Sequence, residues 1–169
     1  MSDVHVITLC TGNAARSVMA GAVLREHVPG LQVSTSGTHV IEGMPMSWRT
    51  REAIESLGLP VPNHRSRQAT PAELDTADLV IALACEHVAW MRRTHPAAAA
   101  RTGTLRRLAR DLQAGPQPLR DRVAALGLAS VELDDWEDVE DPAGGDLDTF
   151  KQCAREIADL LHELVPRLA

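Results

Sequence analysis

The chain begins with a hydrophobic pattern that predicts a buried strand followed by a helix. Residues 4–9 alternate Val, Ile and Leu with His and Thr, and the run ends at Cys10. Thr11, Gly12 and Asn13 have the composition of a loop. From Ser17 onward, apolar residues recur at helical spacing until Pro29-Gly30. The order of strand, short loop and helix is typical of the start of a βαβ unit.

Strand and helix patterns alternate along the rest of the chain. Residues 31–35 predict a second strand, and residues 78–84 are almost all apolar, as in a strand that is covered on both faces of a parallel sheet. Further helices are predicted at residues 47–57, with Ser47 as N-cap and Gly58 past the end, and at 86–93, 104–112, 120–126 and 147–168. We therefore expect an α/β fold, with a single open sheet of about four parallel strands and helices on both faces. No internal repeat or linker interrupts the pattern, so residues 1–169 are expected to form one domain.

The amino-acid composition and the net charge limit the classes of binding partner that we expect. Aromatic residues make up only 2% of the chain, so the core is expected to be aliphatic, and no aromatic platform for nucleic-acid bases is visible. The net charge of −6 disfavours binding to nucleic acid or to an anionic membrane surface. The N-terminal residues lack the pattern of a signal peptide, and no apolar run is long enough to cross a bilayer. We expect a cytoplasmic protein without a nucleic-acid or membrane partner.

The residues with catalytic potential are concentrated in the loop after the first strand. Cys10 and Arg16 are separated by five residues, and Ser17 follows directly. The N–H groups of such a loop, together with the helix N-terminus, form a cradle for a tetrahedral oxyanion. Arg16 can bind two oxygens of that anion, and the same field favours a nucleophilic thiolate at Cys10. The spacing alone is a weak signal, but the strand before it and the helix after it favour a phosphate site above the Cys10 sulfur.

This loop resembles the signature of the low molecular weight protein tyrosine phosphatase family. The match includes Cys10, Gly12, Asn13, Arg16 and Ser17. Further similarity lies in residues 36–38, 64–68 and 78–84 and in Asp141-Pro142, so the resemblance covers nearly the whole chain. It implies a phosphate-binding loop made of Thr11, Gly12, Asn13, Ala14, Ala15, Arg16 and Ser17.

The resemblance implies a phosphomonoester hydrolase that forms a phosphocysteine intermediate and needs no metal or other cofactor. Cys10 would be the nucleophile and Arg16 the oxyanion clamp, while Asp141 would act first as general acid and then as general base. The substrate would be a phosphorylated protein or a small phosphate ester, and inorganic phosphate would be the product. A supporting hydrogen-bond network is expected from Asn13, Ser17, Ser36 and His64. The other six histidines are expected to be surface or packing residues.

The sequence departs from the family pattern in three places, one of which is Val18 in place of the usual proline. Ala15 replaces the second loop cysteine, so the loop disulfide that protects many members from oxidation cannot form. Ala143 and Gly144 follow the Asp-Pro pair, where members specific for phosphotyrosine usually carry aromatic residues, so we expect poor affinity for phosphotyrosine. Residues 39–41 and Trp48 are the remaining candidates for a substrate wall. The sequence therefore specifies the chemistry more closely than the substrate.

Three alternatives stay open at this stage. One is an arsenate reductase that uses Cys10 and an external thiol. A version with paired cysteines is disfavoured, because Cys85 stands alone near the end of the third predicted strand and is expected to be a buried bystander. Another is a phosphatase that acts on a small non-protein phosphate ester. A third is a noncatalytic phosphate-binding adaptor, which is disfavoured because Cys10, Arg16 and Asp141 are all present.

Overall fold

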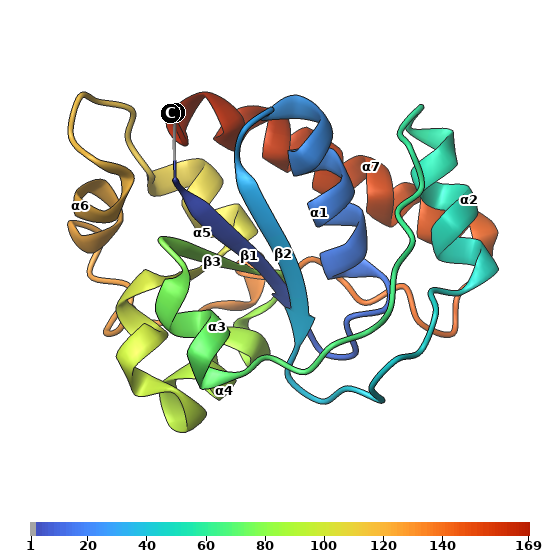
Figure 1. Cartoon of the computed structure of the whole chain (residues 1–169), viewed down its shortest axis with the longest axis horizontal. Helices are drawn as coiled ribbons and strands as arrows, with labels where there is room; N and C mark the ends of the chain where they lie inside the picture. The colour runs from blue at the N-terminus through green and yellow to red at the C-terminus, as the bar shows by residue number, and fades with distance from the viewer. Residues whose placement is uncertain (1–2) are drawn as a thin grey trace.

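A computed structural model describes residues 3–169 and contains a four-stranded parallel sheet with helices around it (Figure 1). The strands are β1 (His5–Cys10), β2 (Gln32–Gly37), β3 (Leu79–Ala82) and β4 (Thr102–Thr104), in the order β2-β1-β3-β4. Every pair of neighbouring strands is parallel. The strand order reverses next to β1, and ligands in open α/β sheets bind beyond the carboxyl ends of the strands at such a point. The predicted fold class is confirmed.

The helices lie on both faces of the sheet, as the alternating pattern predicts. The α-helices are α1 (Arg16–His27), α2 (Trp48–Ser56), α3 (Pro71–Thr76), α4 (Cys85–Thr94), α5 (Leu105–Asp111), α6 (Leu119–Ala124) and α7 (Leu147–Leu164). Three short 3₁₀ helices are η1 (Pro96–Arg101), η2 (Asp135–Glu137) and η3 (Val165–Arg167). Ser47 caps α2 by accepting a hydrogen bond from the Thr50 amide, as predicted.

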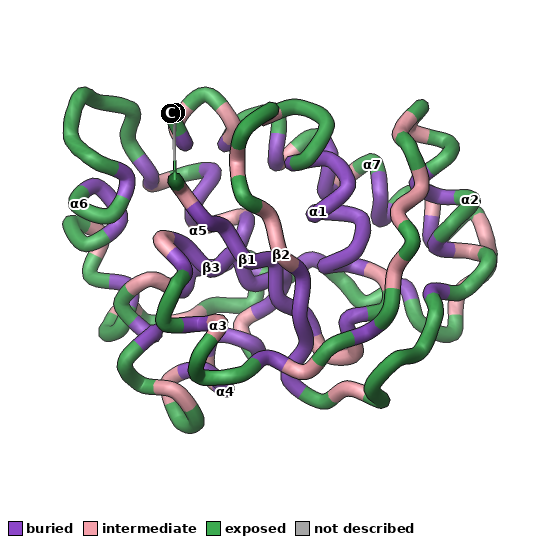
Figure 2. The backbone as a smooth tube through the Cα atoms, viewed as in Figure 1, coloured by how far each residue is buried: buried purple, intermediate pink, exposed green. Residues whose placement is uncertain are grey.

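Alternate residues of β1 face two separate hydrophobic clusters. Val6 and Cys10 pack with the apolar sides of α1, α5 and α7, whereas Ile7 and Leu9 pack with residues of α3 and α4. The sheet is buried on both faces, and the helices turn their outer sides to solvent (Figure 2). The side chains of both clusters are mainly aliphatic, as the low aromatic content predicts. This packing holds Cys10 at the rigid end of the central strand.

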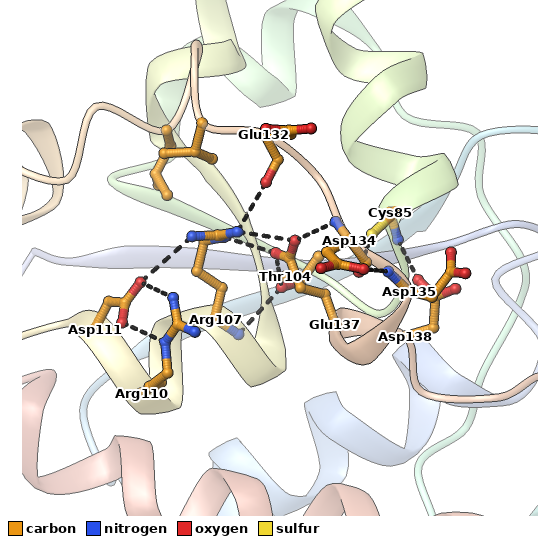
Figure 3. Close-up of polar contacts among 12 residues, drawn as sticks. Cys85, Thr104, Arg107, Arg110, Asp111, Glu132, Asp134, Asp135, Glu137 and Asp138 are labelled. Atoms are coloured by element: carbon orange, nitrogen blue, oxygen red, sulfur yellow. Dashed lines mark hydrogen bonds and ion pairs between the residues drawn. The ribbon is translucent and has the colours of Figure 1, made fainter.

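A buried ion pair fixes the long connection between α6 and α7 (Figure 3). The Glu137 side chain is fully buried and accepts hydrogen bonds from Arg107 Nε at 2.7 Å and from Thr104 Oγ1 at 2.9 Å. Its other carboxylate oxygen accepts from the Asp134 amide at 2.9 Å. Two residues further on, the Val139 amide donates to the Leu83 carbonyl at the end of β3. The connection is thereby anchored to the carboxyl edge of the sheet.

Replacing Glu137 with glutamine is expected to lower the free energy of unfolding by about 3 kcal/mol near neutral pH, because the largely buried Arg107 guanidinium loses its buried partner and keeps only the ion pair with Asp111 at 3.5 Å. Burial by itself raises the pKa of Glu137, but the hydrogen bonds from Arg107, the Asp134 amide and Thr104 outweigh it and lower the pKa. A lowered folded-state pKa stabilises the protein at neutral pH, and this contribution is lost as the pH falls through that pKa. Urea unfolding at about pH 7 and about pH 3 measures the effect.

The matched control is Glu132→Gln, since the Glu132 side chain is exposed and only its backbone carbonyl accepts from Arg107. The control should leave stability within about 0.5 kcal/mol of the original protein. A Glu137→Gln variant that is equally stable at neutral pH would show that the ion pair does not hold this connection in place.

Candidate active site

Asn13 shapes the loop between β1 and α1. Its backbone φ of 50° is the one positive value at a non-glycine position among residues 3–169, and asparagine tolerates this left-handed conformation better than most residues. Its side-chain Nδ2 donates to Ser17 Oγ at 2.9 Å and to Thr35 Oγ1 at 3.0 Å, and its Oδ1 accepts from the Arg67 amide at 2.9 Å. A single buried amide thus ties the loop to α1, to β2 and to the segment before α3.

The Cys10 thiol lies beside the first turn of α1. Its Sγ is 3.0 Å from Ser17 Oγ. Because Ser17 Oγ already accepts from Asn13 Nδ2, the Ser17 hydroxyl hydrogen is free to point at the sulfur. Ala15 at the N-cap makes no side-chain capping bond to the first turn of the helix. Serine hydroxyl and helix N-terminus together favour negative charge at this end of the loop.

His64 supports the loop from outside, as predicted. Its Nε2 lies 2.6 Å from the Asn13 carbonyl oxygen, which also accepts from Ser66 Oγ at 2.8 Å. Burial lowers the pKa of His64, and the nearby Arg25 and Arg67 lower it further, against a smaller upward effect of the hydrogen bond. The imidazole is therefore neutral near pH 7, with its Nε2–H donating to the loop.

Ser36 does not take part in this network. Its hydroxyl is buried and has no hydrogen-bond partner among residues 3–169, so the prediction for this side chain is wrong. The neighbouring Thr35 accepts from Asn13 instead, because successive side chains of a strand point to opposite faces. Gly37 at the end of β2 is needed for close approach: a Cβ there would lie 2.6 Å from the Thr11 carbonyl and 2.9 Å from the Asn13 amide.

Arg16 connects the loop to the segment that carries Asp141. The guanidinium is almost fully buried and donates through Nη1 to the Val139 carbonyl at 2.9 Å. Its Nη2 lies 3.6 Å from Asp141 Oδ2 and 4.0 Å from Glu86 Oε1. The structure thus brings Arg16 and Asp141 together, although 125 residues separate them in the sequence.

The turn that follows Asp141 is made of small residues. Asp141 Oδ1 accepts from the Ala143 amide at 3.0 Å, Gly144 has a left-handed φ of 84°, and a Cβ on Gly145 would lie 2.7 Å from Thr149 Cγ2. A cavity of about 360 Å³ lies beside this turn. It is lined by Ala14, Ala15, Ser47, Arg49, Thr50, Ala143, Gly144, Gly145 and Phe150.

The predicted wall residues are largely exposed. The Trp48 ring is 56% exposed and carries the Arg49 guanidinium 4.8 Å from its centroid, and Ile41 is 74% exposed. Ala143 and Gly144 add no ring beside Asp141.

Sequence reasoning missed Glu86 and His87, which lie in the first turn of α4, shortly after β3. The buried His87 places Nε2 2.9 Å from Thr11 Oγ1, and this hydroxyl donates to Glu86 Oε1 at 3.0 Å. Burial lowers the pKa of His87 to about 3, with smaller contributions from Arg16 and His39. The available signal was their position just past the carboxyl end of a buried strand, where the residues of an α/β site gather.

The other two thiols differ from Cys10 in their surroundings. Burial raises the pKa of Cys85 to about 12 and that of Cys153 to about 12, with nearby carboxylates adding to both shifts. Cys85 is half-buried rather than buried as predicted, and its Sγ lies 3.1 Å from the Asp134 carbonyl. No cluster of His, Cys, Asp and Glu suited to a metal ion occurs within residues 3–169. No helix in this range is long and apolar enough to cross a membrane.

A parallel sheet whose central strand ends in a cysteine-to-arginine oxyanion loop, with an aspartate beside the arginine, defines a cysteine-based phosphatase. The model of the family described as low molecular weight phosphotyrosine protein phosphatase matches residues 5–121. The chain belongs to this family, as its resemblance to the signature implies.

Relatives agree with this assignment. A probable low molecular weight protein-tyrosine-phosphatase, EpsP of Ralstonia nicotianae, is 31% identical over 103 residues, which cover 61% of this chain and 69% of that protein. A protein-arginine-phosphatase of Geobacillus stearothermophilus is 25% identical over 165 residues, covering 97% of this chain and 95% of that protein. The solved structure of the YwlE arginine phosphatase from the same organism has a TM-score of 0.78 at 25% identity and covers 98% of this chain and 92% of that chain. Because these relatives are phosphatases by name, the arsenate reductase hypothesis is not favoured.

Proposed function

We propose that this protein removes a phosphoryl group from a protein side chain through a phosphocysteine on Cys10. The Cys10 sulfur attacks phosphorus while Arg16 and the loop amides hold the phosphoryl oxygens. Asp141 gives its proton to the leaving atom, and the resulting carboxylate then activates the water that releases phosphate. The observation that carries this proposal is the position of Arg16, buried between the Cys10 loop and Asp141.

We further propose that the side chain is phosphoarginine rather than phosphotyrosine. The turn beside Asp141 carries no aromatic ring at Ala143 or Gly144, and the cavity next to it is lined mainly by small residues, with Phe150 also in its lining. The carboxylates of Asp141 and Glu86 lie on the rim of the loop, where they suit a cationic group more than a neutral ring. A relative that this chain matches over nearly its whole length is a protein-arginine-phosphatase by name.

For this substrate the bonds and protons balance as follows. The S–P bond to Cys10 forms as the P–N bond to the guanidino group breaks, and the P–N electron pair goes to nitrogen. Asp141 supplies the proton that nitrogen then needs, which leaves arginine as a guanidinium cation. Water then attacks the phosphocysteine: a P–O bond forms as the S–P bond breaks, and the S–P electron pair returns to the Cys10 sulfur. Asp141 takes up the proton of this water, inorganic phosphate leaves, and the protein is restored.

A side-by-side assay tests the substrate assignment. Two peptides of one sequence, carrying phosphoarginine or phosphotyrosine at the same position, are compared with arsenate plus added thiol. We expect kcat/KM for the phosphoarginine peptide to exceed that for the phosphotyrosine peptide by about 10-fold or more, because a site built for polar and charged contacts rejects a side chain that leaves them unpaired. Faster hydrolysis of the phosphotyrosine peptide would overturn the assignment to arginine and favour phosphotyrosine, the substrate that the EpsP relative's name gives.

A further inference from the structure

We propose that Glu86 determines specificity by binding the guanidinium group of the phosphorylated arginine side chain. This inference rests on the proposed function and adds to it a residue outside the loop signature and outside the Asp-Pro turn. Glu86 is the second residue of α4, which begins at the carboxyl end of β3. Its place in the fold is therefore set by a rigid strand and helix rather than by a flexible loop.

A chain of hydrogen bonds holds one oxygen of the Glu86 carboxylate at the edge of the phosphate loop. Thr11 Oγ1 donates to Glu86 Oε1 at 3.0 Å. Because Thr11 has only one hydroxyl hydrogen, the His87 Nε2–H is the donor toward Thr11 Oγ1, at 2.9 Å. His87 Nε2 is also 3.3 Å from Glu86 Oε1. The buried, neutral His87 thus fixes the Thr11 hydroxyl, and Thr11 fixes the carboxylate.

The second oxygen of this carboxylate remains available to a substrate. Glu86 Oε2 has no hydrogen-bond partner within the described residues, and the side chain is 67% exposed. The first oxygen lies 4.0 Å from Arg16 Nη2, the group placed to bind the phosphoryl oxygens. A group bonded to a phosphoryl held by Arg16 is therefore presented to Glu86.

The negative charge of Glu86 has opposite effects on the binding of two kinds of substrate. A carboxylate beside the phosphate loop repels the phosphoryl dianion, so it weakens the binding of an ester whose leaving group is neutral. A guanidinium leaving group reverses the sign of this interaction, and its planar set of N–H donors matches a carboxylate. Asp141 is assigned to proton transfer, so Glu86 is the carboxylate that binds the cation. A negative charge in this position is an advantage only when the substrate brings a positive one.

The test compares Glu86→Gln with the original protein on a phosphoarginine peptide and on p-nitrophenyl phosphate. We expect kcat/KM for the phosphoarginine peptide to fall about 10- to 100-fold, because the charge-assisted contact is lost. For p-nitrophenyl phosphate, kcat/KM should stay within about threefold or rise, because a repulsive charge has been removed. Retained activity on this ester also shows that the variant is folded. The matched control is Glu52→Gln, an exposed glutamate on α2, which should change neither value.

Each other outcome overturns the inference. Equal losses on both substrates would mean that Glu86 only holds Thr11 and Arg16 in place. No loss on the phosphoarginine peptide would mean that the carboxylate does not touch the substrate. If the original protein hydrolyses the ester but not the phosphoarginine peptide, the proposed substrate and this inference fail together. If the original protein hydrolyses both substrates, and Glu86→Gln has the same ratio of kcat/KM for the phosphoarginine peptide to kcat/KM for the ester, only the inference about Glu86 fails.

Discussion

Replacing Cys10 with serine is expected to reduce hydrolysis of p-nitrophenyl phosphate by at least about a thousandfold, which places it below detection in a steady-state assay. The Cys10 sulfur lies 3.0 Å from the Ser17 hydroxyl beside the helix N-terminus, and a cysteine sulfur is a far better nucleophile than the serine hydroxyl that would replace it. The phosphate site itself should persist, since Arg16 and the loop amides are unchanged. Binding of inorganic phosphate to the Cys10→Ser protein, measured by calorimetry, checks this point.

The control for Cys10→Ser is Cys153→Ser. The Cys153 thiol is buried on α7, and its raised pKa keeps it protonated. We expect this variant to keep most of its activity, because Cys153 has no place in the proposed reaction. Hydrolysis that survives Cys10→Ser at more than about one per cent would exclude the cysteine as nucleophile.

Replacing Asp141 with asparagine is the second change with a large expected effect. For phosphoarginine peptides and alkyl phosphates, whose leaving groups need a proton, kcat should fall about 100- to 1000-fold. For p-nitrophenyl phosphate, whose leaving group departs as an anion without much help, the loss should be at least about tenfold smaller. Stopped-flow or steady-state rates across a series of leaving groups measure this difference.

Asp148→Asn provides the matched control, because Asp148 is an exposed acid in the first turn of α7, a short distance along the chain from Asp141. It should retain the rates of the original protein on every substrate. A loss at Asp141→Asn that is the same for good and poor leaving groups would remove the general-acid role and leave Asp141 as a partner of Arg16.

Several elements of the fold could be predicted from the sequence because the local residue pattern agrees with the structure that they adopt. The run that became β1, the Ser47 cap of α2 and the apolar β3 each carry a signal within a few residues. β4 carries none: three residues with Gly103 in the middle show no periodicity, and only pairing with β3 makes them a strand. The six-residue α3 was missed for a different reason: Thr70, Pro71 and Glu73 carry the start signal of a helix, but the helix is too short to show apolar periodicity.

Prediction of the site residues from the sequence was limited in the same way. Cys10, Arg16 and Asn13 lie in one contiguous loop, so their relation could be inferred from the sequence. Ser36 was given a role that Thr35 performs, because a one-residue change along a strand moves a side chain to the opposite face. Glu86 comes to the site only through the pairing of β3 with β1, a contact between distant segments that one sequence does not show.

The low aromatic content of the chain bears on the proposed substrate through the residues around the phosphate loop. These are the small residues Ala143 and Gly144 and the carboxylates of Asp141 and Glu86. A phosphatase that selects an aromatic ring gains from stacking and from apolar burial. Here the turn at Ala143 and Gly144 offers neither, while Asp141 and Glu86 offer charge. Under the proposed function, the loop carries out the chemistry of the family, and the residues around it favour a cationic leaving group.

The central claim, a covalent phosphocysteine on Cys10, is tested most directly by trapping the intermediate. Asp141→Asn protein is mixed with p-nitrophenyl phosphate, whose leaving group needs little help from an acid, so that the intermediate still forms while its hydrolysis lacks the base. The reaction is quenched on the millisecond timescale and mapped by mass spectrometry. The account predicts one phosphoryl group per protein on the peptide that contains Cys10, appearing before free phosphate. Turnover without a phosphorylated protein, or a phosphoryl group on any other residue, would contradict it.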